Sequence, residues 1–219
     1  MNEELETAKE FAKAGQEIAK TAGKVIDAGS DLARFCAKAL GTVPEDLVGV
    51  AGGDYLREVR IRNLDSLMRK TEKKLQDRGV EEPRPLNTKL ALPLLDAASE
   101  ESDETLQDMW SSLMANAMDP DRDVSLQRIF IDTLKQFDPV DALVFKAIAT
   151  AYHEPSDQQM SDDRRGRNAV NAATALPLRP TQFDLSREKL VKLGCLGSNY
   201  SFTSLSKELW FALEKDGAS

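Results

Sequence analysis

Hydrophobic residues recur at intervals of three and four along the middle of the chain. In three consecutive stretches they stand at i, i+3, i+4, i+7, i+8 and i+11, the spacing of an amphipathic α-helix. Asp-Pro pairs separate the stretches, and Asp138 with Pro139 is typical of an N-cap followed by the first helical position. Short connections make neighbouring helices pack against each other. The apolar positions are Leu106, Met109, Trp110, Leu113, Met114 and Ala117, then Leu126, Ile129, Phe130, Thr133, Leu134 and Phe137, then Val140, Leu143, Val144, Ala147, Ile148 and Ala151.

Residues 3–40 predict one long helix, because they contain no proline and are rich in alanine and lysine. Its apolar stripe has heptad spacing and alternates large and small residues. A glycine inside a helix costs roughly 1 kcal/mol relative to alanine, so close packing against another helix is the simplest compensation. The partner helix is expected in the same molecule or in a second copy of the chain. Insertion of the predicted 3–40 helix into a membrane surface is a third interpretation. This N-terminal seam consists of Phe11, Gly15, Ile18, Ala22, Val25, Gly29 and Leu32.

The glycine-rich residues 41–53 indicate a hinge, after which a second helix is expected up to Gly79. Residues 54–80 carry eight basic and five acidic groups, whereas residues 81–122 carry three basic and ten acidic groups. The basic face of this helix is interpreted as solvated, as a site for an anionic partner, or as docked against the acidic stretch. Its residues are Arg57, Arg60, Arg62, Arg69, Lys70, Lys73, Lys74 and Arg78.

Two prolines make residues 80–87 a predicted linker. The apolar run Leu90–Ala98 predicts a helix in which Pro93 introduces a kink or a new start. Ser102 is the expected N-cap of the helix that follows.

The end of the chain has a different pattern, beginning with the polar residues 153–167, which predict a loop. The order of elements after this loop resembles half of a winged helix-turn-helix module. The expected elements are a helix over 168–176, a helix capped by Asp184 or Ser186 and ended by Gly194, a strand over 200–203 and a helix over 205–213.

The predicted fold is therefore all-α, with a small C-terminal winged-helix-like element that contains a short β-hairpin. Three regions are expected along the chain. They are a long N-terminal helix with a glycine-rich hinge (1–53), a helical bundle core (54–152) and the winged-helix-like module (153–219).

The net charge of −8 argues against bulk nucleic-acid binding, which needs clustered basic residues. The winged-helix pattern still raises a nucleic-acid hypothesis, with Arg187, Lys189 and Lys192 as candidate contacts to an anion or nucleic acid. Several acidic residues in the same stretch weaken this electrostatic footprint. Winged helices also bind proteins, and a protein partner is the favoured interpretation.

The sequence contains no residue spacing typical of a catalytic or metal-binding motif, so no catalytic residue, cofactor or metal ligand is predicted. The single histidine, His153, has no second histidine or cysteine pair beside it. No glycine-rich phosphate loop occurs. Asp119, Asp121 and Asp123 alternate like calcium ligands, but the glycine and glutamate that a calcium loop needs further on are missing. They are interpreted as capping and turn residues.

A cytoplasmic protein is expected. The acidic N-terminus differs from the basic start of a secretory signal. No apolar run reaches the roughly 18 residues that cross a bilayer. Cys36 and Cys195 are expected to be reduced, buried thiols.

Four segments, in this order, resemble the abortive infection alpha family of bacteria: Leu86–Glu101, Leu106–Ala117, Ile131–Ala142 and Leu190–Leu196. The likeness spans roughly residues 50–213. It implies a role in phage exclusion, in which an infected cell stops growing or dies before the phage matures. The family supplies no catalytic residues to carry over.

The leading hypothesis is a non-enzymatic anti-phage protein that acts through a protein partner or through self-assembly. A nucleic-acid-binding winged-helix regulator and a membrane-active toxin that uses the N-terminal helix are the alternatives.

Overall fold

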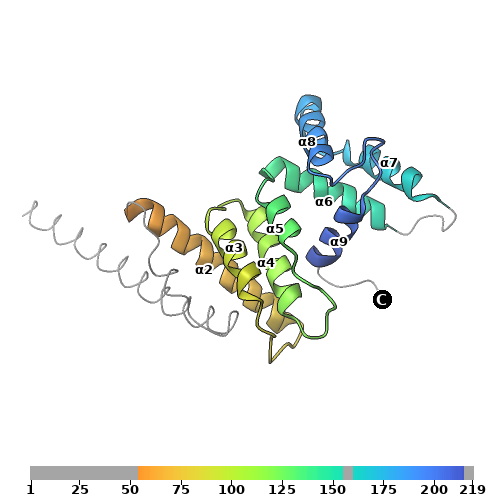
Figure 1. Cartoon of the computed structure of the whole chain (residues 1–219). Coiled ribbons are helices and arrows are strands. Elements are labelled where there is room, and N and C mark those ends of the chain that lie inside the picture. The colour runs from red at the N-terminus through yellow and green to blue at the C-terminus, as the bar shows by residue number, and fades with distance from the viewer. Residues whose placement is uncertain (1–53, 155–159, 215–219) are drawn as a thin grey trace, which may run out of the picture.

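The computed structural model describes residues 54–154 and 160–214, and these residues are mainly helical (Figure 1). The all-α prediction is confirmed for this part of the chain, where an isolated antiparallel bridge between Leu196 and Phe202 is the sole β-type pairing. The described helices are α2 (Asp54–Asp77), α3 (Thr88–Ser99), α4 (Glu104–Met118), α5 (Arg128–Leu134), α6 (Pro139–His153), α7 (Asp162–Ala173), α8 (Pro180–Lys192) and α9 (Ser204–Leu213).

The first four described helices form one bundle, in which α2 packs against α3 and α4, and α3 packs against α5. Ion pairs join successive turns of α2 to successive turns of α4, so these two helices run parallel. Helix α4 is the most enclosed element, because every residue from Leu106 to Met118 except Asp108 is buried. It carries Trp110, whose side chain is 1% exposed, at its centre.

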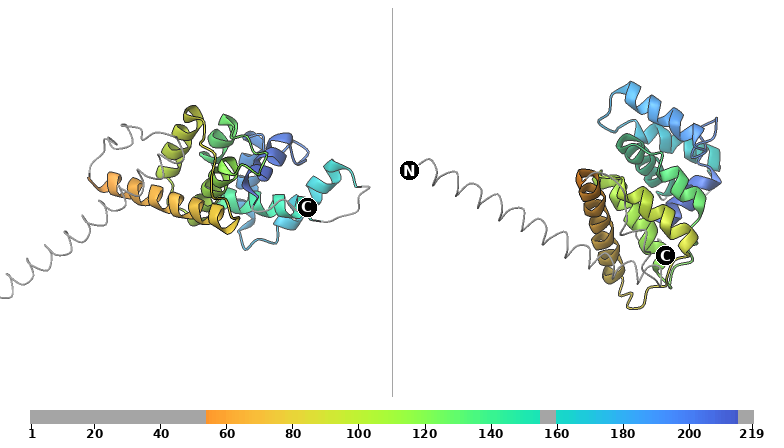
Figure 2. Two further views of the ribbon diagram at one scale, coloured as in Figure 1. Left: turned by 90° about the horizontal axis from the view of Figure 1, so that it is seen from below. Right: turned by 60° about the vertical axis from the view of Figure 1, so that its left-hand side comes forward.

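The last four helices form a second bundle around α6, which packs against α7, α8 and α9. Both views in Figure 2 place this group beside the first bundle. Helix α9 also packs against α4, and α6 does so to a lesser extent. The buried apolar residues of both bundles therefore form a single core cluster.

Several predicted boundaries are confirmed. Helix α6 begins at Pro139, and its N-terminal turn is closed by the Asp138 backbone N–H, which donates to Asp141 Oδ2 at 2.8 Å. Gly79 and Gly194 follow the ends of α2 and α8 with φ values of +73° and +75°. Both glycines adopt the left-handed conformation that commonly terminates a helix.

Other boundaries were predicted wrongly. Helix α3 runs through Pro93 from a start at Thr88, and Asp103 rather than Ser102 caps α4. Helix α8 begins at Pro180, ahead of both predicted caps, because proline at a first helical position loses no hydrogen bond.

The segment 153–167 is also not the loop that its polarity suggested, since α7 begins at Asp162. This helix buries only small groups at its first turns, namely Gly166 and Ala169, so it lacks the large apolar residues that reveal a helix in sequence.

The predicted β-hairpin is not supported. Residues 200–203 form no strand, and the Leu196–Phe202 bridge closes a tight loop instead. The loop is too short for a second bridge, because the chain reverses between Gly197 and Ser201, where the Gly197 N–H donates to the Ser201 carbonyl at 2.9 Å. The winged-helix assignment therefore lacks the β-hairpin that would form the wing.

Candidate interaction site

The N-terminal seam, Phe11, Gly15, Ile18, Ala22, Val25, Gly29 and Leu32, lies outside the described residues. The structure therefore leaves its role as a prediction, and the same holds for Cys36. The other cysteine, Cys195, is fully buried, as expected. Burial raises the pKa of its thiol to about 11, which keeps the reactive thiolate scarce at neutral pH.

The basic face of α2 pairs with the acidic residues that follow it in sequence. Arg60 reaches Glu100 at 2.6 Å, and Lys74 reaches Asp108 at 2.7 Å. Lys70 pairs with Glu104 in the same row. Burial acts to raise the pKa of Asp108, but its hydrogen bond with Lys74 leaves that pKa below the usual value. These ion pairs, called the charge seam below, support the interpretation that the acidic stretch docks on the basic helix.

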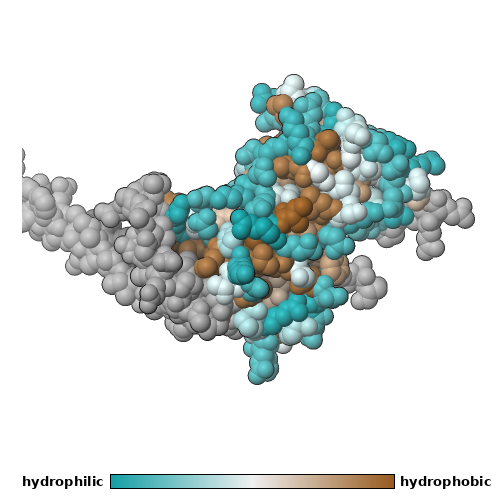
Figure 3. Space-filling view, in the orientation of Figure 1, coloured by the Kyte–Doolittle hydropathy of each residue, from teal (hydrophilic) through white to brown (hydrophobic). Residues whose placement is uncertain are grey.

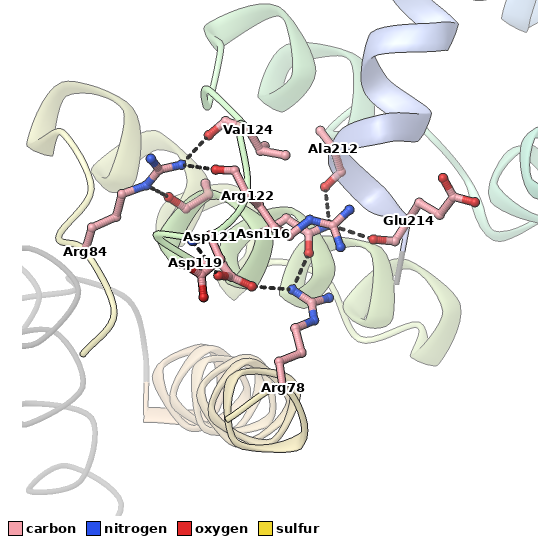
Figure 4. A network of polar contacts seen from close by, with 10 residues as sticks. Arg78, Arg84, Asn116, Asp119, Asp121, Arg122, Val124, Ala212 and Glu214 are labelled. Carbon is pink, nitrogen blue, oxygen red and sulfur yellow. Dashed lines mark hydrogen bonds and ion pairs between the residues drawn. The ribbon is translucent and has the colours of Figure 1, made fainter. Parts of the chain in front are cut away.

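A polar network continues the charge seam to the end of the chain (Figure 4). Arg78 Nη1 donates to Asn116 Oδ1 at 2.6 Å and lies 3.4 Å from Asp119 Oδ2. Asn116 is fully buried, and its Nδ2 donates to the carbonyls of Ala212 at 2.8 Å and Glu214 at 3.0 Å. One side chain of α4 therefore links α2 of the first bundle to the last turn of α9.

Arg84 fixes the loop between α4 and α5 through three backbone carbonyls. Its Nε donates to the carbonyl of Ala117 at 2.8 Å, and its Nη2 donates to those of Arg122 at 3.0 Å and Val124 at 2.9 Å (Figure 4). The guanidinium thus satisfies acceptors that the end of α4 leaves without helical partners.

Asp119 acts in the same loop as a turn residue, since its Oδ1 accepts the Asp121 N–H at 3.0 Å. This contact supports the sequence interpretation of these aspartates. Within residues 54–154 and 160–214, no group of three or more His, Cys, Asp or Glu side chains is arranged to hold a metal ion.

Two of the three predicted nucleic-acid contacts have partners within the protein. Lys189 Nζ lies 2.6 Å from Asp141 Oδ2 and 2.7 Å from Asp138 Oδ2. Burial acts to lower the pKa of Lys189, but hydrogen bonds to these two carboxylates hold it above its ordinary value. Lys192 is exposed. Lys189, which was predicted to contact an anion or nucleic acid, therefore holds α8 against the start of α6.

Arg187, the third predicted contact, belongs to a different arrangement. Its Nη2 pairs with Asp184 at 3.0 Å, and its guanidinium carbon lies 4.6 Å from the centre of the Tyr200 ring. A cation–π contact at such a partly exposed site is worth about 0.5–1 kcal/mol. Arg187 of α8 therefore contacts the ring of Tyr200 in the following loop.

Tyr200 has a backbone conformation that tyrosine rarely adopts. Its φ of +62° makes it the one described residue other than glycine with a positive φ. The left-handed conformation costs an L-residue about 1–2 kcal/mol. Sequence reasoning missed this residue. The turn-forming residues Gly197, Ser198 and Asn199 mark the loop, but they do not reveal which residue carries the unfavourable angle.

Helix α7 lies directly against this loop at Gly166. A Cβ at that position would stand 2.8 Å from the Phe202 amide nitrogen and 3.1 Å from the Tyr200 carbonyl oxygen. Only glycine allows such close approach of two backbones. The backbone of the 196–202 loop therefore packs directly against the backbone of α7 at this point.

Aromatic rings surround His153 at the end of α6. Its ring stacks on Trp210 at 6.3 Å between centres and lies edge-on to Tyr152 at 5.1 Å. Partial burial is the largest cause that lowers the pKa of His153, and the nearby cations Arg165 and Lys207 add to it, while Glu214 acts in the opposite direction. The histidine is thus a member of an aromatic cluster.

Large apolar side chains also reach the surface of the described bundles. Figure 3 shows hydrophobic residues over α5 that extend toward the base of α8. The exposed side chains are Leu92, Ile129, Leu143, Leu185 and Phe211, of which Leu185 is 67% exposed. None of the described helices combines the length and apolarity that a bilayer crossing requires.

In the part of the chain that the structure describes, the fold is mainly helical and forms two bundles, and many charged residues hold their helices together. A family model described as abortive infection alpha matches residues 58–216. The chain therefore belongs to the abortive infection alpha family, as its sequence motifs suggested, and this membership indicates an anti-phage role. Neither a curated protein nor a solved structure matches the chain.

Proposed function

We propose that this protein serves abortive infection as a non-enzymatic interaction protein that assembles with itself or with a protein partner. One observation carries the proposal: large apolar side chains are exposed on five of the described helices, and Leu185 on α8 is mostly uncovered. Scattered exposed apolar residues are common, but a gathered group marks an interaction surface. The spacing of the N-terminal seam in the sequence predicts a second apolar surface, with the close-packing pattern of a helix pair.

The self-assembly part is tested on the full chain by light scattering together with protection of bacteria against phage. Ile18→Gln with Val25→Gln places two polar groups on the N-terminal seam, and both the solution mass and the protection are expected to fall. Lys20→Gln with Lys24→Gln is the matched control, because it introduces the same residue on the opposite helix face. Loss of protection with an unchanged solution mass would move the proposal from self-assembly to a separate protein partner. A monomer in every variant, with protection intact, contradicts it.

The two alternatives have distinct readouts. A nucleic-acid regulator would bind duplex DNA with an affinity that falls steeply as salt rises. Lys192→Ala would weaken that binding, since Lys192 is exposed on α8. A membrane-active toxin would release dye from anionic liposomes in a manner that depends on Phe11, Ile18 and Val25.

A further inference from the structure

Helix α7 presents a polar face that the described part of the chain leaves uncovered. The helix packs on α6 and buries small residues, among them Gly166 and Ala169. In Figure 1 it lies at the edge of the second bundle. The opposite face repeats at intervals of three and four residues, which place its members side by side on the helix surface. The exposed residues of this face are Arg164, Arg167, Asn168 and Asn171.

The two arginines of this face have no ion-pair or hydrogen-bond partner among the described residues. On α2 and α5, by contrast, exposed arginines pair with carboxylates one turn away. Asp162, at the start of α7, is paired with Lys207. Asp163 stands one turn before Arg167, but no ion pair joins the two in the described chain. Both guanidinium groups are therefore free to contact a ligand.

The sequence around α7 departs from the acidic character of the chain. The whole chain has 37 acidic and 29 basic residues, yet residues 164–183 contain four arginines and no acidic residue. Arg179, the last of the four, is exposed at the N-cap of α8. Helix α8 continues with Asp184 and Glu188, both exposed. The local excess of positive charge therefore belongs to α7 and the turn after it, and not to α8.

Arginine and asparagine are side chains that recognise base edges in the major groove of DNA. Arginine donates two parallel hydrogen bonds to guanine, and asparagine forms two with adenine. Arginine also pairs with phosphate. Asparagine costs a helix interior up to about 0.7 kcal/mol relative to alanine, so helix stability does not explain Asn168 and Asn171. The major groove is about 12 Å wide and admits one α-helix.

We propose that the exposed face of α7 is a binding site for duplex DNA, in which Arg164 and Arg167 anchor the duplex and the two asparagines face its bases. The net charge of −8 makes the binding depend on this one basic face. The inference goes beyond the proposed function and does not rest on it, because none of the exposed large apolar side chains lies on α7. It also differs from the winged-helix prediction, which placed the contacts on α8.

The experiment measures binding of the full chain to a labelled, mixed-sequence DNA duplex by fluorescence anisotropy at low salt. Arg164→Gln with Arg167→Gln should weaken binding at least about tenfold. The same variant should make the slope of log affinity against log salt shallower by about 1–2. Arg62→Gln with Lys73→Gln is the matched control, because it removes equal charge from exposed positions of α2, and it should change the affinity less than about threefold. Lys192→Gln should also leave the affinity nearly unchanged.

A second variant separates lost binding from lost structure. Asn168→Ala with Asn171→Ala removes the proposed base contacts but favours the helix. Its affinity should fall at least about fivefold, while its thermal midpoint stays within about 2 °C of the parent or rises. A fall in affinity with an unchanged midpoint supports a direct contact.

Any of the following results would overturn the inference. They are no binding of the parent chain to duplex DNA at low salt, parent-like binding by both α7 variants, an equal loss of affinity in the α2 control, and tighter binding to single-stranded RNA through the same arginines.

Discussion

The two bundles use charged residues in different ways. In the first bundle, basic residues of α2 pair with Glu100 at the end of α3 and with carboxylates of α4 along the charge seam, so charge joins one helix to another across their surfaces. The second bundle also contains such a pair, between Lys189 and Asp141, but in addition its cations lie over aromatic rings: Arg165 and Lys207 over Tyr152, and Arg187 over Tyr200. The first arrangement follows the regular spacing of helices, whereas the second depends on where individual rings stand.

The bundles also differ in how closely their backbones approach. Helices α2 and α4 contain no glycine, so every position along them carries a side chain. In the second bundle the backbone of α7 meets the 196–202 loop with no side chain between them, at Gly166. We therefore expect surface substitutions in the first bundle to change its stability little. In the second bundle, a single methyl group added at Gly166 should change the stability measurably.

The largest effect is expected at the core that both bundles share. Trp110→Ala removes a side chain that is 1% exposed, and such a change costs about 3–5 kcal/mol of unfolding free energy. Urea unfolding measures it, with Phe211→Ala as a control at a 43% exposed position, expected within about 1 kcal/mol of the parent. The chain has two tryptophans, so the variant leaves Trp210 as a fluorescent reporter in the second bundle. If Trp210 fluorescence and far-ultraviolet dichroism gave different midpoints, the two bundles would not share one cooperative core.

Asn116→Ala tests the link between the bundles. The substitution leaves the carbonyls of Ala212 and Glu214 without this donor and removes one acceptor of Arg78, at an expected cost of about 2–3 kcal/mol. Limited proteolysis should then cut α9 faster than α2. Asn168→Ala, at an exposed asparagine of α7, is the control; it should leave cleavage unchanged and alter stability by no more than the slight gain that alanine brings to a helix. Equal acceleration of cleavage in α2 and α9 would argue that Asn116 stabilises the whole chain rather than its last helix.

Gly166→Ala tests the close backbone contact of the second bundle. In an ordinary helix interior this change stabilises by up to about 1 kcal/mol. Here the new Cβ would stand 2.8 Å from a backbone nitrogen, so the loop must move, and a net cost of about 1–2 kcal/mol is expected. Thermal unfolding measures it against Asn171→Ala, an exposed position of the same helix that should gain slightly from alanine. A stabilised Gly166→Ala protein would show that the contact is looser than described.

Double-mutant cycles on the charge seam should give smaller energies. Lys70 and Glu104 form a pair in which the Glu104 side chain is 84% exposed, and a coupling of about 0.5 kcal/mol or less is expected, falling with salt. Lys74 and Asp108 are 9% and 41% exposed, so their coupling should reach about 1 kcal/mol and resist salt better. Equal couplings for the two pairs would mean that burial does not set the strength of the seam.

The regular bundle was largely predictable from sequence, and the irregular part was not. The positions of α4 and α6 follow from apolar spacing, and the start of α6 follows from Asp138 and Pro139, because periodicity and capping are local properties. The second half of α7 was predicted as part of a helix over 168–176, but its first turns were missed because they bury only the small residues Gly166 and Ala169. The missing hairpin has a different cause: residues 200–203 have strand-forming side chains, but the chain reverses so tightly between Gly197 and Ser201 that a single bridge forms.

In the candidate site, too, residue types could be predicted from the sequence but their partners could not. Sequence reasoning found Arg187 and Lys189 as charged residues of one helix, but their roles depend on partners far along the chain, namely Asp138, Asp141 and Tyr200. No spacing rule connects these positions. The docking of the acidic stretch on α2 was foreseen as one interpretation, because opposite charges lay on two adjacent helices.

The smallest effect is expected from His153, which lies in the aromatic cluster yet is exposed enough for solvent to screen it. Burial first, and then Arg165 and Lys207, lower its pKa from 6.5 in the folded protein. Between the folded pKa and 6.5 the unfolded chain binds more protons than the folded one, so the free energy of unfolding falls as pH is lowered through this window. His153→Gln should remove this slope, so the difference between parent and variant measures it apart from carboxylates, which titrate at lower pH. If the parent became more stable than the variant as pH fell below 6.5, the pKa would be raised and the cluster would favour the charged ring. Protonated His153 would then be a further cation in contact with an aromatic ring, Trp210, in addition to those over Tyr152 and Tyr200. The second bundle would differ still more from the charge seam.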